Sequence, residues 1–120
     1  MKNFYRELLS SYKIRRYEDG FLITTDIIYF GADERASFYV KPLGDFFVVS
    51  DLGQTLSYLS KNADIEHYRA KIGDLLRRFD AVLDQGEIRA VLPPFESKNT
   101  IRRLNNFIFT TGLIANIDLI

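Results

Sequence analysis

Apolar residues recur at two different periods along the chain, and the change of period divides it into a strand-rich part and a helix-rich part. Between residues 14 and 49, short β-branched and aromatic runs alternate with turn residues, which is typical of an antiparallel meander. Asp19-Gly20 suits a type I′ turn and predicts a hairpin between residues 14–17 and 21–25. Further strands are expected at 37–41, ended by Pro42, and at 46–49.

Apolar spacing by threes and fours predicts helices in the rest of the chain, at 2–12, shortly after Gly53, at 65–83 and from Ser97 through Thr111. Gln85-Gly86 is expected to stop the long helix, and Gly112 to bend or end the last one. A short strand at 87–92 precedes the last helix. Together these elements predict one α+β domain over residues 1–120. It would have a small antiparallel sheet of about four or five strands, with helices packed mainly on one face.

The composition indicates that the chain can bury a hydrophobic core, and it excludes several kinds of functional site. The 120 residues include ten Phe and seven Tyr, and 47% are apolar, which suffices to bury a core without cross-links. The chain has no Cys and one His, which excludes disulfides, thiolate catalysis and zinc sites built on Cys or on two His residues. Sixteen basic and sixteen acidic residues cancel, and no cofactor is expected.

Charged positions near the start and the lack of a long apolar run bear on localisation. Residues 1–7 carry charges every few positions, unlike the apolar stretch of a signal peptide. No uncharged apolar window approaches the roughly 20 residues of a membrane span. A cytoplasmic protein, in a bacterium or a phage-infected host, is the prediction.

Two segments resemble a known family. They are Ile-Thr-Thr at residues 23–25 and Phe-Val-Val-Ser-Asp-Leu-Gly-Gln-Thr-Leu at residues 47–56. The chain is similar in these segments, and in its order of elements, to the bacterial and phage domain-of-unknown-function family 1828. That family has a strand ending in Ile-Thr-Thr and a later strand running into a Thr-Asp-Asp-Gly-x-Thr turn. Asp26 replaces the family's usual proline, and Ser50 and Leu52 depart from its turn motif. The resemblance implies no assigned chemistry, but a phage or mobile-element context.

Asp51 and Gly53 stand where a predicted strand meets a helix. The carboxylate of Asp51 can accept hydrogen bonds from the free N–H groups of the first helical turn. The same N–H groups could instead hold a phosphate. Because an acidic residue at the helix start repels phosphate, capping is the preferred interpretation, and Asp19, Gly20, Asp51 and Gly53 are all assigned to structural turns.

A metal-dependent hydrolase is the least favoured class. Asp26, Asp33, Glu34 and Lys41 lie on or beside consecutive strands, and carboxylates with a lysine are what Mg²⁺-dependent phosphodiester cleavage needs. Their spacing is loose, and a solvated hairpin tip is the preferred explanation of the acids. His67, near the start of the long helix, is interpreted as a surface residue. No catalytic or metal-binding residue is therefore assigned, and the protein is not expected to be an enzyme.

Basic residues fall in three clusters that could bind nucleic acid. Each cluster is diluted by acids, and dedicated nucleic-acid binders are usually basic on one side. Nucleic-acid binding is kept as the alternative function. The four residues assigned to it are Arg77, Arg78, Arg102 and Arg103.

The apolar C-terminal stretch leaves two interpretations open. Phe107, Ile108 and Phe109 place apolar groups on more than one face of a helix, and more follow within 113–120. The helix could be packed centrally under the others, or it could form a self-association surface and make the protein a homodimer.

The favoured function is a non-enzymatic protein-binding module. It would bind a host protein, for example one used in defence against phages, and inhibit or modulate it. Aromatic and arginine side chains dominate interface energetics, so the binding residues are predicted among exposed ones of these types. The residues assigned are Tyr17, Tyr68, Arg77 and Arg78.

Overall fold

Six antiparallel strands form one sheet in the computed structural model, which describes residues 12–28, 35–92 and 97–119. The sheet order is β1-β2-β3-β4-β6-β5. The predicted α+β class is confirmed, and the sheet has one strand more than the four or five that were predicted. The strands are β1 (Lys13–Tyr17), β2 (Gly20–Ile28), β3 (Arg35–Leu43), β4 (Phe46–Ser50), β5 (Val82–Asp84) and β6 (Glu87–Leu92).

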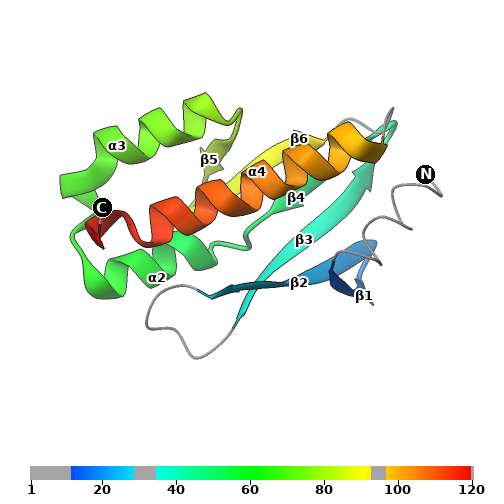
Figure 1. Cartoon of the computed structure of the whole chain (residues 1–120), viewed down its shortest axis with the longest axis horizontal. Coiled ribbons are helices and arrows are strands. Elements are labelled where there is room, and N and C mark those ends of the chain that lie inside the picture. Colours follow the sequence, from blue (N-terminus) through cyan, green and yellow to red (C-terminus); the bar gives the residue numbers. More distant parts are fainter. Residues whose placement is uncertain (1–11, 29–34, 93–96, 120) are drawn as a thin grey trace.

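Three helices pack against one face of this sheet, as predicted. They are α2 (Gln54–Asn62), α3 (Ile65–Arg78) and α4 (Ser97–Ala115), followed by the short 3-10 helix η1 (Ile117–Leu119). α4 lies along the sheet, with α2 and α3 on either side of its C-terminal half (Figure 1). The predicted helix at residues 2–12 lies outside the described residues, apart from Tyr12.

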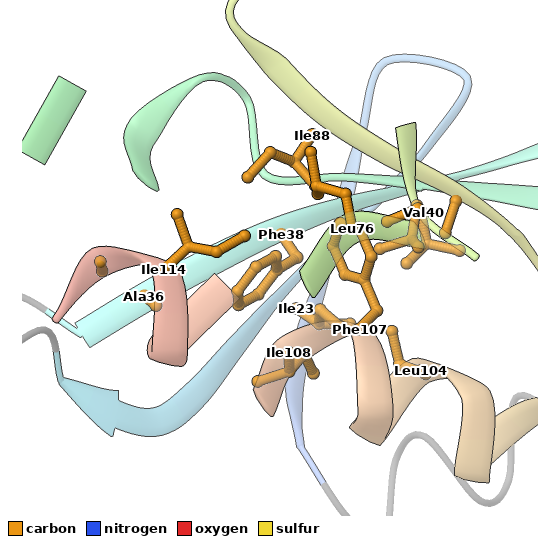
Figure 2. Packing of buried hydrophobic residues seen from close by; sticks show 14 of the residues in the cluster. Ile23, Ala36, Phe38, Val40, Leu76, Ile88, Leu104, Phe107, Ile108 and Ile114 are labelled. Carbon is orange, nitrogen blue, oxygen red and sulfur yellow. The ribbon is translucent and has the colours of Figure 1, made fainter. Parts of the chain in front are cut away.

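The core lies between this inner face of the sheet and the helices. Phe38 of β3 meets Phe107 of α4 edge to face, with ring centroids 5.8 Å apart, near the centre of the packed cluster (Figure 2). Alternate residues of the central strands point into it, as the pleat of a strand requires. These inner-face residues are Phe21, Ile23, Ala36, Phe38, Val40, Phe47, Val49, Ile88, Ala90 and Leu92.

The intervening residues form the opposite side of the sheet, called here the outer face. Within the described residues no helix packs on it, and several of its apolar side chains are about half exposed. Its most exposed apolar members are Leu43, Phe46, Val82 and Val91.

The first hairpin turns one residue earlier than predicted. Tyr17 pairs with Gly20, so the two loop residues are Glu18 and Asp19, and Glu18 has the positive φ of 50°. Gly20 is the first residue of β2, and its backbone lies against β3. A Cβ at Gly20 would stand 2.2 Å from the carbonyl oxygen of Val40. Glycine is therefore required there by close approach of two strands, rather than by turn geometry.

We expect Gly20→Ala to lower the free energy of unfolding by about 1–3 kcal/mol, because a backbone carbonyl cannot move aside for the new methyl group. Gly73→Ala is the matched control. Gly73 lies inside α3, where a Cβ would meet only the Arg77 side chain, at 3.5 Å, so alanine should stabilise by about 0.5–1 kcal/mol. Urea unfolding measures both changes, and the same sign for both would contradict the close approach.

The long helix ends five residues before the predicted end at residue 83. Phe79 leaves the helical conformation, Asp80 has φ 55°, and Val82 begins β5. Gln85 and Gly86 have φ 53° and 81°, the positive pair that a type I′ hairpin turn needs. The predicted helix stop is thus the turn between β5 and β6.

Two smaller boundary predictions were also wrong. Pro42 lies inside β3 and pairs with Phe47, one residue before the strand ends. β2 pairs with β3 only as far as Val40, so Pro42 has a neighbouring strand on one side only, where proline is tolerated. Gly112 neither bends the chain out of α4 nor ends it, since the helix continues to Ala115.

Candidate functional site

Asp51 joins three parts of the chain through its carboxylate. Oδ1 accepts hydrogen bonds from the N–H groups of Gly53, at 2.8 Å, and Ile88, at 2.9 Å, and Oδ2 accepts from Thr55 N at 3.3 Å. The side chain is fully buried. Asp51 N also donates to the carbonyl oxygen of Ile88 at 3.1 Å. The carboxylate therefore accepts from an N–H group of the first turn of α2, whose N-cap residue is Gly53, and ties the start of α2 to β6.

A polar network continues from this junction onto the outer face. Leu52 N donates to Ser50 Oγ at 2.9 Å, and Ser50 in turn donates to Glu87. Arg89 pairs with Glu87 at 3.1 Å and with Asp84 at 3.2 Å. The hydrogen bonds from Arg89 and then Ser50 hold the pKa of Glu87 below its ordinary value. The β5–β6 edge of the outer face is thus acidic on balance, with two carboxylates around one guanidinium.

Of the four residues considered for a metal site, only the side chain of Lys41 lies in the described part of the chain. Asp33 and Glu34 lie outside the described residues, as does the side chain of Asp26. Lys41 pairs with Asp19 at 3.2 Å between its Nζ and the carboxylate. Hydrogen bonds from Tyr39 and Lys41 lower the pKa of Asp19, and the bond to Asp19 raises the pKa of Tyr39 to about 12.

In the part of the chain that the structure covers, no group of three or more His, Asp or Glu side chains could hold a metal ion. His67 lies exposed in the first turn of α3, with its ring edge-on to Tyr68 at 4.8 Å. Nor, among residues 12–28, 35–92 and 97–119, is there a helix with the length and apolar character to cross a membrane.

Two of the arginines predicted for binding come together from different helices. Arg78, at the end of α3, and Arg103, in α4, line one hollow of about 230 Å³ beside β6. We call it the arginine hollow. Its lining residues are Arg78, Phe79, Asp80, Ala90, Val91, Leu92, Arg103 and Asn106.

The hollow lies along the half of β6 that β5 leaves unpaired. β5 pairs with Glu87, Ile88 and Arg89 only, so within the described residues no strand pairs with the outer edge of Ala90–Leu92. Unpaired strand edges can accept another extended chain. The hollow therefore combines a free β edge with two guanidinium groups.

Acidic residues neutralise these arginines only in part. Asp74 pairs with Arg78 at 3.3 Å and lies 3.9 Å from Arg77, and Asp80 lies 3.5 Å from Arg103. Arg102 forms no ion pair within the described part of the chain. Four arginines thus face two aspartates in this region, and both arginines that line the hollow are paired, so the excess positive charge lies beside the hollow, on Arg77 and Arg102. Arg77 and Arg102 do not line the hollow itself.

The four side chains predicted to bind a protein partner do not share one surface. Tyr17 lies on the outer face in β1, against the ring of Tyr39 at 5.6 Å. Arg77 and Arg78 belong to α3, which contacts β5 at the opposite edge of the sheet. Tyr68 of α3 is partly buried against the core. Of the four, only Arg77 and Arg78 are neighbouring exposed side chains, and both lie near Asp74.

The apolar C-terminal stretch lies mostly in the core. Among the described residues of this stretch, which end at Leu119, the exposed apolar members are Phe109, 57% exposed, and Leu119, 58% exposed, and Leu113 is partly exposed. The predicted C-terminal homodimer is not tested by these side chains and stays a prediction. The buried members are Leu104, Phe107, Ile108, Ile114, Ala115 and Ile117.

Sequence reasoning missed the floor of the hollow and the outer face. Both depend on which strand lies beside which, and no local pattern reports that β6 inserts between β4 and β5. The half-apolar alternation of 82–92 was the one available signal, because it marks strands with one open side.

Comparison with protein-family models, with curated proteins and with solved structures finds no match to this chain. The resemblance to family 1828 therefore stays a prediction.

Proposed function

We propose that this protein is a non-enzymatic protein-binding module whose partner docks in the arginine hollow. The observation that supports the proposal is the meeting of Arg78 and Arg103 over an apolar floor at a free strand edge. Arginine in a pocket with apolar walls is a frequent anchor of protein interfaces. The protein would then recognise its partner through two kinds of interaction, ion pairs with the arginines and backbone hydrogen bonds with the strand edge.

The chemistry of the hollow specifies the kind of segment that would fit. An extended chain can pair its backbone with the free edge of Ala90–Leu92, continuing the line of β5. A carboxylate on that chain can be bound by the planar donor forks of Arg78 and Arg103. A small apolar side chain can lie against Phe79, which is partly exposed in the hollow. An acidic, extended segment of a partner protein is therefore the proposed ligand.

The resemblance to family 1828 suggests in which biological context the protein would act. A protein carried by a phage or mobile element acts on host components, and occluding a strand-forming segment of a host protein would inhibit or modulate that protein. The partner is accordingly proposed to be a host protein, such as one used in defence.

Nucleic-acid binding is the alternative, and the same arginines favour it. Arg77, Arg78, Arg102 and Arg103 lie on neighbouring helices, α3 and α4, which contact one another. Asp74 and Asp80 pair with Arg78 and Arg103, so they would compete with a phosphate and with a partner's carboxylate alike and do not separate the two candidates. A nucleic-acid complex would also weaken steeply as salt rises.

The experiment is quantitative affinity capture from host lysate with the tagged full chain, with and without nuclease, followed by binding measurements on the captured partner. The double variant Arg78→Ala/Arg103→Ala should weaken binding by about thirtyfold or more, as the loss of interface hot spots does. Arg69→Ala is the matched control, since Arg69 is an exposed arginine of α3 paired with Glu66 through Nε at 2.9 Å.

A partner that survives nuclease, binds the control normally and is lost by the double variant supports the proposal. Capture that depends on nucleic acid would replace it with the alternative. Equal binding by the double variant and wild type would remove the hollow from the interaction.

A further inference from the structure

The outer face carries a continuous row of side chains that crosses all six strands. Cross-strand partners in an antiparallel sheet point to the same side, so the row follows directly from the register. From the β1 edge to the β5 edge it consists of Arg15, Leu22, Tyr39, Ser50, Arg89 and Val82. Parallel to it, Lys13 pairs with Thr24 at one edge, and Glu87 pairs with Asp84 at the other.

The middle of the outer face is apolar and slightly concave. Leu43 of β3 and Phe46 of β4 face each other there, 58% and 42% exposed. Beside them Val48 lies between Val91 and Lys41, and Lys41 is the one cation of this central part, paired with Asp19 among the described residues. A shallow hollow of about 270 Å³ lies over the same two central strands and reaches to Arg89. An apolar centre with charged margins is the usual anatomy of a protein interface.

The two margins of the face carry opposite charge. At the β1 edge, Lys13 and Arg15 form no ion pair within the described residues. At the β5–β6 edge, Asp84 and Glu87 share the single cation of Arg89. The face is therefore positive at one end of the strand order and negative at the other.

We propose that a second copy of this chain covers the outer face, related by a twofold axis that runs parallel to the strands between β3 and β4. Such an axis reverses the strand order, so β1 of one copy lies over β5 of the other, and each charged margin meets its opposite. The dimer face shares Val91 with the arginine hollow but does not include its two arginines, and the inference does not depend on the proposed function.

The register then assigns the contacts. Lys13 lies over Asp84 of the second copy, and the symmetry repeats that contact. Leu43 lies over Phe46 on the axis. Gly20, which has no side chain, lies opposite the exposed Val91. The long, flexible lysine side chain spans the offset that the twist of the sheets leaves at the edge.

A charge-reversal experiment tests the symmetry directly. Lys13→Glu places Glu over Asp84 twice, and Asp84→Lys places Lys over Lys13 twice, so each variant alone should dimerise at least about tenfold more weakly. Mixed together, the two variants form a heterodimer in which both contacts are attractive, and dimerisation should return. Sedimentation equilibrium at low salt measures all three samples. Recovery on mixing arises only when position 13 of one copy meets position 84 of the other.

The apolar centre is tested by a matched pair of phenylalanines. Phe46→Asp should abolish the dimer, whereas Phe109→Asp, which alters a more exposed phenylalanine on α4, should leave it intact. Circular dichroism of both variants checks that they fold. A wild-type protein that stays monomeric at every concentration overturns the proposal. A dimer that survives Phe46→Asp, or charge variants that fail to recover on mixing, would do the same.

Discussion

Replacing Asp51 with alanine should lower the free energy of unfolding by about 3–5 kcal/mol, because each backbone N–H left buried without a partner costs about 1–3 kcal/mol. Three such groups lose their acceptor together, those of Gly53, Thr55 and Ile88. Asp51→Asn keeps one acceptor oxygen and should lose less. Chemical denaturation measures the free energy of unfolding of the three proteins, which should decrease from wild type to Asp51→Asn to Asp51→Ala.

Asp64 supplies the control for Asp51. It caps α3 at the surface, where its Oδ1 accepts from Glu66 N at 3.1 Å. Asp64→Ala should cost about 1 kcal/mol, the usual worth of an exposed N-cap. If both alanine variants lost the same amount, the Asp51 carboxylate would be an ordinary cap and the link to β6 would contribute nothing.

Phe107→Ala should lower the free energy of unfolding by about 3–5 kcal/mol, because it opens a cavity that the surrounding side chains cannot fill. Phe107 is 2% exposed and lies against Phe38 in the centre of the core (Figure 2). Thermal or chemical unfolding of the full chain measures the loss.

Phe109 lies two residues further along the same helix and is 57% exposed. Phe109→Ala should therefore change the free energy of unfolding by no more than about 0.5 kcal/mol. The pair shares residue type, helix and substitution, so the difference reports burial alone. A larger loss from Phe109→Ala than from Phe107→Ala would mean that α4 presents its opposite side to the sheet.

Local patterns were enough to predict most of the elements. The aromatic and β-branched run at 46–49 and the Asp-x-Gly that follows it predicted β4, the turn and the start of α2, because the signals for strand, cap and glycine agree there. Ser97 likewise marked the start of α4. At these positions, interactions between residues close together in the sequence determine the local structure.

Predictions were wrong where contacts between residues distant in the sequence determine the local structure. Val82 and Leu83 continue the three-and-four spacing of α3, yet they form β5, because the Gln85-Gly86 turn lets them pair with β6. Gly20 looks like a turn residue, but the carbonyl of Val40 on another strand explains it. The arginine hollow required two helices to be placed together, and no spacing along the chain contains that information.

The strand order has a consequence for how the chain reaches its native state. β1 to β4 pair with their neighbours in sequence and can form early as a unit, and β5 and β6 can form a hairpin by themselves. Joining the two pieces requires β6 to find β4 across α2 and α3, and the Ile88–Asp51 hydrogen bond at that junction spans 37 positions. Closing so long a loop costs entropy before any contact repays it, so this step should limit the folding rate. A nascent chain that still lacks the residues beyond 80 has no β6 to pair with β4. The edge of β4 next to Asp51 would then be unpaired and open to aggregation with another chain.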